Sequence, residues 1–256
     1  MAVSYFIGHG SPILALEQNG YTEDMRKLGE SLGKPDGVVV FTAHWTRPGL
    51  MLTATDGVQE TIHDFGGFPD ELFQVQYPAK GSARIAEELR ERLTSEGIGA
   101  QVTDARGLDH GVWVILRHLF PEADVPVIAV SVDPSLPPQE QYRIGQALSG
   151  WTDRNVVIIG SGSTVHNFRE MSFGRPDAAD PWAKEFDDWL VERMRQGETE
   201  ALFAYRDSAP HGRRATPDYE HFLPLFIALG AGSGEAELLH QSYQYGSLSH
   251  LIIRFG

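Results

Sequence analysis

The sequence contains no cysteine, and this absence excludes several kinds of site at once. Without thiols the chain has no disulfide bond, no thiolate nucleophile and no zinc or iron–sulfur centre built on cysteine. Any metal that the protein binds must therefore be held by histidine, aspartate or glutamate. The ten histidines and the acidic side chains beside them are the first places to look for a functional site.

Basic side chains are also scarce, because 21 lysines and arginines stand against 35 acidic residues and leave a net charge of −14. Nucleic acids and anionic membranes both attract basic protein surface, so neither is an expected partner. No apolar run approaches the roughly 18 residues of a membrane span. The opening MAVSYFIGHG lacks the basic and apolar regions of a signal peptide, so we expect a cytoplasmic protein.

The order of apolar segments predicts an α/β fold in a single domain spanning residues 1–256. Continuous β-branched runs predict buried strands at residues 3–7, 37–42, 125–131, 155–160 and 248–255. Apolar residues at helical spacing predict helices at 82–95, 139–148 and 181–195. This alternation predicts a largely parallel or mixed sheet with helices on both sides.

Three histidines follow predicted strands. His9 lies in GHGSP after the first strand, His44 in FTAHW after the second, and His166 in GSGSTVHNF after the fourth. Because sites in α/β sheets form outside the carboxyl ends of strands, we expect these side chains to converge on one edge. A lone histidine is more often a hydrogen-bonded structural residue, but three at equivalent positions favour a catalytic metal site with open positions.

Two further segments each leave two interpretations open. In GLDHGVW, Asp109 and His110 form either an acid–base loop or the N-cap of an apolar helix. In DYEHFLPL, Glu220 and His221 stand side by side, and either could be the last metal ligand. Glu220 could instead only favour the helix N-terminus.

Seven motifs in order along the chain resemble those of the class III extradiol ring-cleavage dioxygenases, and more narrowly those of the 4,5-DOPA dioxygenase group of bacteria and plants. They are HGSP (9–12), AHW (43–45), HDFGGFP (63–69), YPAKG (77–81), GLDHGVW (107–113), GSGSTVHN (160–167) and EHFLPL (220–225). The resemblance covers nearly the whole chain. It implies a single catalytic domain with a mixed β-sheet flanked by helices and a metal at a strand edge.

The resemblance also implies roles for five histidines. His9, His44 and His221 match the metal ligands of the family. His166 matches a histidine beside the metal, which is a fourth ligand in zinc-loaded forms or the acid–base residue in turnover. His110 matches a second histidine that faces the substrate and would polarise bound oxygen or a substrate hydroxyl.

The implied activity is extradiol cleavage of a catechol-type, DOPA-like ring by O2. It needs one divalent metal per chain, which is Fe(II) for turnover or Zn(II) as the metal found in the purified protein. Trp45, Phe68 and Trp113 suit a planar aromatic substrate. The chain departs from the family at Thr216, where an Ala-His-Pro sequence is common, and His211 lies nearby but out of register. We expect a monomer or a small homo-oligomer.

Two other functions remain open. A zinc-dependent hydrolase would use a metal-bound hydroxide, with His166 or Glu220 as its base. A non-catalytic protein would bind only a metal or an aromatic acid. Because every candidate ligand is present, the dioxygenase is the favoured interpretation.

Overall fold

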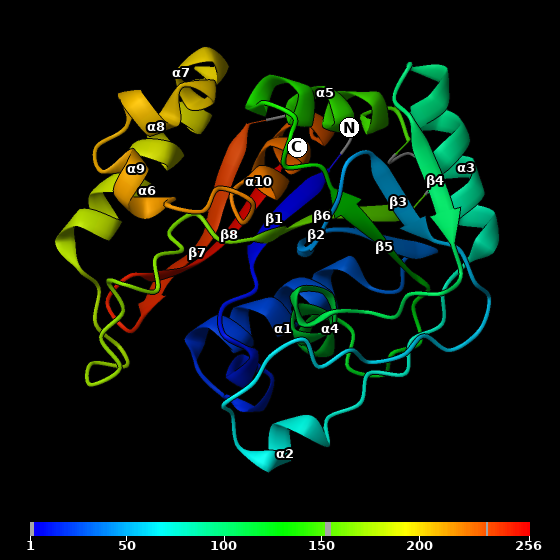
Figure 1. The fold of residues 1–256 in the computed structure, drawn as a ribbon, viewed down its shortest axis with the longest axis horizontal. Helices are drawn as coiled ribbons and strands as arrows, with labels where there is room; N and C mark the ends of the chain where they lie inside the picture. Colours follow the sequence, from blue (N-terminus) through cyan, green and yellow to red (C-terminus); the bar gives the residue numbers. More distant parts are fainter. Residues whose placement is uncertain (1–2, 152–154, 234) are drawn as a thin grey trace.

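The structure, a computed structural model, describes residues 3–151, 155–233 and 235–256, and in this part of the chain eight strands form one sheet in the order β4-β3-β5-β2-β6-β1-β8-β7 (Figure 1). The strands are β1 (Ser4–Gly8), β2 (Gly37–Thr46), β3 (Leu50–Thr53), β4 (Ala100–Thr103), β5 (Val127–Val132), β6 (Val156–Gly162), β7 (Ala236–Gln244) and β8 (Leu248–Phe255). The central pairs β1–β6, β6–β2 and β2–β5 are parallel, whereas β8 is antiparallel to β1 and to β7. The predicted mixed α/β sheet is confirmed.

The five predicted strands are all present, and four of the five end later than predicted. The largest difference is at β2, which continues to Thr46, so His44 lies inside the strand rather than after it. The strands that the sequence did not predict are β3, β4 and β7. Each has partly exposed residues in its burial pattern, and β4 and β7 carry polar side chains, so none shows the continuous apolar run of a buried strand.

The three predicted helices are α3 (Ala83–Ser95), α5 (Pro138–Leu148) and α6 (Pro181–Arg195). Ser82 caps α3, since its side chain accepts a hydrogen bond from the Ile85 backbone N–H. The other helices are η1 (Pro12–Leu16), α1 (Gly20–Leu32), α2 (Asp70–Phe73), α4 (His110–Leu119), α7 (Thr199–Phe203), α8 (Tyr205–Ser208), α9 (Gly212–Ala215) and α10 (Leu223–Ala231). Among the described residues, none of these helices combines the length and apolar character needed to cross a bilayer.

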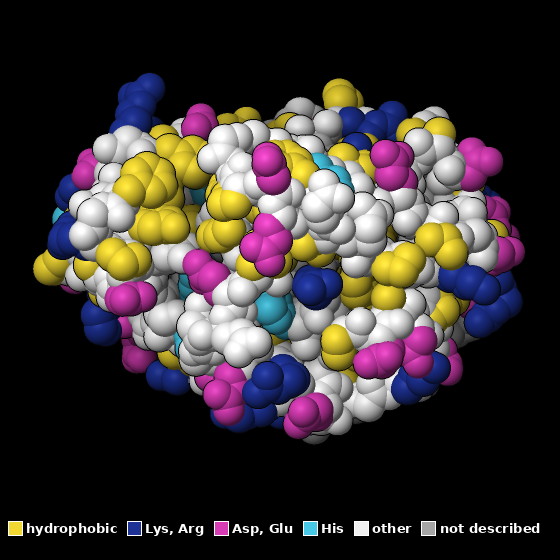
Figure 2. Space-filling view, turned by 90° about the horizontal axis from the view of Figure 1, so that it is seen from below, with side chains coloured by type: hydrophobic (Ala, Val, Ile, Leu, Met, Phe, Trp, Pro, Cys, Tyr) yellow, Lys and Arg dark blue, Asp and Glu magenta, His cyan; other side chains and the backbone are white. Residues whose placement is uncertain are grey.

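Helices cover both faces of the sheet (Figure 1). α1 and α4 pack on one face, where Val38 and Val40 of β2 join their core. α3, α5 and α10 pack on the other face, where Val39 and Phe41 join theirs. Successive β2 residues therefore point to opposite cores, which explains an apolar run without alternation. Figure 2 shows the outer surface on the α1 and α4 side, where acidic and basic side chains are interspersed.

The approach of α10 to β6 depends on two glycines in the strand. A Cβ on Gly160 would lie 2.2 Å from the Pro224 carbonyl oxygen, and one on Gly162 would lie 2.1 Å from the His221 carbonyl oxygen. A side chain at either position would collide with backbone. These glycines therefore let the segment before α10 lie directly on the carboxyl end of β6, and the Ser163 N–H donates to the His221 carbonyl there.

Candidate active site

Five histidines meet at the carboxyl end of the central parallel strands. His9 directly follows β1, His44 lies near the end of β2, His166 follows β6, His110 begins α4 and His221 just precedes α10. The ring centroid of His9 lies 4.7 Å from that of His44, 5.3 Å from that of His221 and 5.5 Å from that of His110. The His166 ring stacks on the His221 ring, with a centroid distance of 3.6 Å. The expected convergence of histidines on one sheet edge is therefore observed. These five residues are called the histidine cluster below.

Three Nε2 atoms point at a common place in the histidine cluster. His44 Nε2 lies 3.0 Å from His9 Nε2 and 3.2 Å from His221 Nε2. Burial lowers the pKa of both His9 and His44 far below the ordinary histidine value, and the other histidines of the cluster lower it further. Both rings are therefore neutral at pH 7.

The other nitrogens of two of these rings are held by acceptors. His9 Nδ1 lies 3.1 Å from Ser161 Oγ, whose own proton is donated to the Gly111 carbonyl oxygen. Ser161 Oγ must therefore accept from His9 Nδ1. His221 Nδ1 lies 3.0 Å from Glu220 Oε1, and an ionised carboxylate only accepts. In the neutral rings, the Nε2 atoms of His9 and His221 are consequently left as lone pairs.

This arrangement suits a cation. His44 Nε2 carries at most one proton and cannot bond to both neighbouring lone pairs. Nitrogen ligands lie about 2.0–2.1 Å from zinc, so at angles of about 90–110° two of them on one ion are about 2.8–3.4 Å apart, a range that includes both separations in the cluster. Ligand atoms of His9, His44 and His110 also lie within 4.8 Å of one another, as do those of His166, Glu220 and His221. The donor set fits one divalent metal.

Asp64 joins two histidines of the cluster. Its Oδ1 accepts hydrogen bonds from the backbone N–H of His110 at 3.0 Å and from His110 Nδ1 at 2.9 Å, and its Oδ2 lies 3.6 Å from His44 Nδ1. Burial acts to raise the pKa of Asp64, but the hydrogen bonds from His110 outweigh it and leave the pKa below its ordinary value. Asp64 is therefore ionised, and in neutral His110 it leaves Nε2 as an acceptor.

Asp109 occupies the N-cap position of α4, as one of the two interpretations predicted, but its side chain makes no capping bond. Instead Oδ1 accepts from Thr42 Oγ1 at 2.7 Å and Oδ2 accepts from Arg106 Nη2 at 3.0 Å. The same Thr42 hydroxyl accepts from the His44 N–H at 3.2 Å. Fully buried Asp109 thus ties the end of β2, which carries His44, to the start of α4.

The interpretations of Glu220 and His166 can be weighed from their contacts. Glu220 Oε1 is hydrogen-bonded to His221 Nδ1, and this bond lowers the pKa of the carboxyl group. The carboxylate thus lies behind His221, whose Nε2 is the atom that approaches His44. Burial, followed by the nearby His221, lowers the pKa of His166 to about 3. His166 is therefore a neutral imidazole at pH 7.

Aromatic side chains gather beside His110. The Phe65 ring lies 5.7 Å from His110 and 5.4 Å from Phe68. Trp113 is fully buried behind Phe65, and its Nε1 donates to the Ile62 carbonyl oxygen. Trp45 lies under the Arg106 guanidinium, 4.6 Å from its ring centre. Phe65, which lies in the HDFGGFP motif, is thus the aromatic residue whose ring contacts His110 on this side of the cluster.

Thr216, at which the chain departs from the family motif, and the nearby His211 make local contacts. The Thr216 hydroxyl donates to the Gly212 carbonyl oxygen at 2.8 Å, and the His211 ring lies 3.0 Å from Glu185. The Ala215 carbonyl oxygen accepts from the His166 N–H, so this segment fixes the backbone beside His166.

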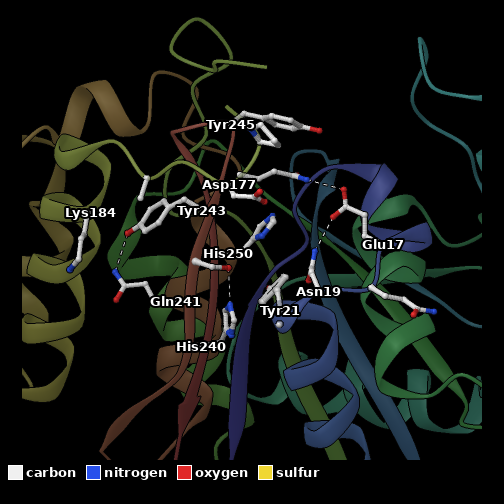
Figure 3. Close-up of a pocket in the computed structure, with 16 residues that line it drawn as sticks. Glu17, Asn19, Tyr21, Asp177, Lys184, His240, Gln241, Tyr243, Tyr245 and His250 are labelled. Carbon is white, nitrogen blue, oxygen red and sulfur yellow. Dashed lines mark hydrogen bonds between the residues drawn. The ribbon is translucent and has the colours of Figure 1, made fainter. Parts of the chain in front are cut away.

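A cavity of about 710 Å³ lies apart from the histidine cluster (Figure 3). It is lined by α1, by the loop before α6 and by the β7–β8 hairpin, with Tyr21, Tyr243, His240 and His250 among its residues. None of the five cluster histidines lines it. Both nitrogens of His240 already have partners, Asp24 at 2.8 Å and Ser242 at 2.7 Å.

The comparisons with known proteins agree with this geometry. Residues 4–256 match the family described as the catalytic LigB subunit of aromatic ring-opening dioxygenase. The chain is 38% identical to 4,5-DOPA dioxygenase extradiol of Beta vulgaris, with 98% of this chain and 96% of that protein covered. It is 37% identical to the protein of the same name from Escherichia coli (strain K12), with 98% and 93% covered.

A solved structure agrees as well. The crystal structure of uncharacterized protein JW3007 from Escherichia coli K12 matches all of this chain and all of its own, with a TM-score of 0.85 and 31% sequence identity. The likeness therefore extends from sequence to the complete fold. The chain belongs to the family of aromatic ring-opening dioxygenases and is an enzyme of that family.

Proposed function

We propose that this enzyme is an extradiol dioxygenase that opens a catechol-type, DOPA-like ring with O2, using one divalent metal held by His9, His44 and His221. The observation that carries the proposal is the approach of three Nε2 atoms to one place, two of them fixed as lone pairs by acceptors behind the rings. Fe(II) bound there would bring the two catechol oxygens and O2 together and would acidify a catechol hydroxyl.

The proton transfers fall to the two remaining histidines. His166 is neutral at pH 7, because burial and His221 hold its pKa near 3, and it can therefore accept a proton from the second catechol hydroxyl. His110 donates Nδ1–H to Asp64, which leaves Nε2 as the nitrogen that can form a hydrogen bond with a substrate hydroxyl.

The names of the relatives and the walls of the site support this substrate class. The Beta vulgaris and Escherichia coli relatives are named for DOPA, and a protein of Mycolicibacterium smegmatis, 27% identical over 58% of this chain, is named for 2,3-dihydroxyphenylpropionate and its cinnamic acid analogue. All three names specify a catechol with a carboxylic acid chain. Phe65, Phe68 and Trp113 give the His110 side an aromatic wall suited to such a ring.

The zinc hydrolase is less well supported. Its best base would be Glu220, but that carboxylate accepts the hydrogen bond from His221 Nδ1 and so lies behind the ring whose Nε2 approaches His44. Zinc bound in the same cluster would be compatible with the ligand set but has no redox chemistry of its own.

The test is anaerobic reconstitution with Fe(II), followed by oxygen uptake and absorbance scans against DOPA, caffeate, catechol and 2,3-dihydroxyphenylpropionate. We expect a yellow ring-opened product formed in proportion to the O2 consumed, and no reaction in the zinc-loaded enzyme. Stoichiometric metal binding without O2 uptake on any of these catechols would contradict the proposal.

A further inference from the structure

Phe168 is a large apolar side chain exposed beside the histidine cluster. Its side chain is 66% exposed, and its ring lies 4.6 Å from that of His166 at an interplanar angle of 71°. His166 in turn stacks on His221. Phe168 is therefore one ring removed from the proposed metal ligands, on the side that faces solvent.

The backbone on both sides of Phe168 is anchored. The His166 N–H donates to the Ala215 carbonyl oxygen at 2.9 Å. Asn167 Nδ2 donates to the Arg214 carbonyl oxygen at 2.7 Å, and Asn167 Oδ1 accepts from the Arg169 N–H at 3.1 Å. Phe168 is thus held between fixed neighbours, and its exposure at this place is a feature of the fold.

A second exposed phenylalanine in the same segment shows what an ordinary surface position looks like. Phe173 is 70% exposed, and the ring that it contacts is Tyr245 at 5.0 Å, on the rim of the cavity in Figure 3. Single exposed apolar residues are common and need no function. Phe168 differs because its ring touches a histidine proposed to move a proton.

Phe168 also has a counterpart across the cluster. Phe65 lies edge-on to His110 at 5.7 Å and 85°, just as Phe168 lies edge-on to His166. Phe65 is backed by Phe73 and Trp113, whereas Phe168 is open to solvent. The two histidines proposed to transfer protons are therefore each flanked by a phenyl ring, and only the Phe168 ring has a large uncovered surface.

We propose that Phe168 binds the substrate by packing its ring against the catechol at the open side of the histidine cluster. The inference rests on the proposed dioxygenase function and adds a residue that determines substrate affinity. An aromatic substrate would cover the exposed phenyl face and make a ring–ring contact in the geometry that aromatic pairs prefer. The contact holds the ring next to His166 and leaves the proton transfers to the histidines.

The experiment compares Phe168→Ala, Phe168→Leu and the matched control Phe173→Ala with the wild type. KM and kcat are measured by O2 uptake in the Fe(II) enzyme with its best catechol. Binding of 4-nitrocatechol is measured separately by absorbance without O2, so that affinity is obtained without turnover. We expect Phe168→Ala to raise both KM and Kd about tenfold with kcat little changed. Phe168→Leu should lie between, and Phe173→Ala should match the wild type.

The outcomes separate the two proposals. If the wild type turns over a catechol but Phe168→Ala and Phe173→Ala have the same KM and Kd, the inference is overturned and the dioxygenase function stands. A fall in kcat alone, with KM and Kd unchanged, would also overturn it, because Phe168 would then support His166 and not the substrate. If the wild type neither consumes O2 nor binds 4-nitrocatechol, the proposed function fails and the inference with it. Metal content and thermal midpoint check folding, and Phe168→Leu decides the matter if the alanine variant is unstable.

Discussion

The histidine cluster and the region beside the cavity of Figure 3 both contain a deeply buried histidine, but the contacts of these rings differ. His9 is 1% exposed and His250 is 3% exposed, and burial lowers the pKa of both, that of His250 to about 3. In the cluster, acceptors hold the outer nitrogens and turn the Nε2 atoms toward one another. Beside the cavity, His250 stacks on Tyr21 at 4.6 Å and 10°. Burial alone therefore does not mark a chemical histidine. What distinguishes the cluster is that an acceptor holds one ring nitrogen while the other faces the nitrogens of further histidines.

The two regions meet at the carboxyl end of β1. The Tyr21 hydroxyl donates to the Gly8 carbonyl oxygen at 2.5 Å, and a Cβ on Gly10 would lie 2.6 Å from His250 Nε2. His9 lies between these two glycines. The cavity region thus supports the backbone from which a cluster histidine projects, and substitutions in each region should give different readouts.

The largest effect is expected for His44→Ala compared with His240→Ala. His44 Nε2 is the atom shared by the two close contacts, so its loss should reduce metal affinity by more than the 10–100-fold that loss of an outer partner costs. His240→Ala should keep full metal content, since both of its nitrogens are bonded within the protein. Metal analysis after dialysis measures both variants. Equal metal content in the two would remove the distinction between the regions.

The next largest effect is expected on the free energy of unfolding when Asp187 is replaced. It is fully buried in α6, where Oδ2 accepts from Ser249 Oγ at 2.6 Å and from the cavity residue Tyr243 at 2.9 Å. Burial raises its pKa to about 6, so between about pH 4 and 6 the folded state holds a proton that the unfolded state has lost. Its contribution to the free energy of unfolding therefore falls as pH rises through this window and stays lower above it.

Asp187→Asn should abolish that contribution. Relative to the variant, the wild type should lose about 2–3 kcal/mol of unfolding free energy between pH 4 and pH 7. Urea denaturation of both proteins at a series of pH values gives the difference and cancels the titration of the histidine cluster. Asp188→Asn, on the exposed side of the same helix, is the control and should not reproduce the change. A pH-independent difference for Asp187→Asn would contradict the raised pKa.

Asp64→Asn tests the carboxylate behind the cluster. An asparagine oxygen can still accept from both His110 donors, as Asp64 Oδ1 does, but it carries no charge, so the basicity of His110 should fall. We expect kcat to fall about 10–100-fold at saturating Fe(II). Asp177→Asn, which changes a carboxylate lining the other cavity, should keep wild-type kcat. Wild-type kcat in Asp64→Asn would show that His110 does not depend on this partner.

The smallest effect is expected at the junction of the two regions. Gly10 and Gly49 both have positive φ, +64° and +71°, so alanine costs about 1–2 kcal/mol at either position. Only at Gly10 does the new Cβ meet another group, His250 Nε2, whereas nothing lies within 4 Å at Gly49. Gly10→Ala should therefore lose more stability than Gly49→Ala and bind metal a few-fold more weakly. Identical metal affinities would show that His9 is insensitive to the cavity side.

The sequence predicted the central strands and the histidines at their ends because those segments are buried on both faces and leave a plain apolar signal. It indicated a helix beginning near Glu220 but not the extent of α10, since LPLFIALGA is apolar throughout and has no polar face to mark a helix. The role of Asp64 was also missed, although HDFGGFP was among the recognised motifs. Only the fold brings its carboxylate from the loop before α2 to the start of α4.

The close packing of the His221 segment on Gly160 and Gly162 of β6 has a consequence for synthesis of the protein. His9 and His44 leave the ribosome early, but His221 is made near the end of the chain, and its place on β6 is fixed only when α10 has packed. A chain that stops before His221 carries four of the five cluster histidines and lacks one of the three proposed ligands. Because a ligand stabilises only the state that binds it, metal would stabilise chains that extend through α10 and not chains that stop before His221.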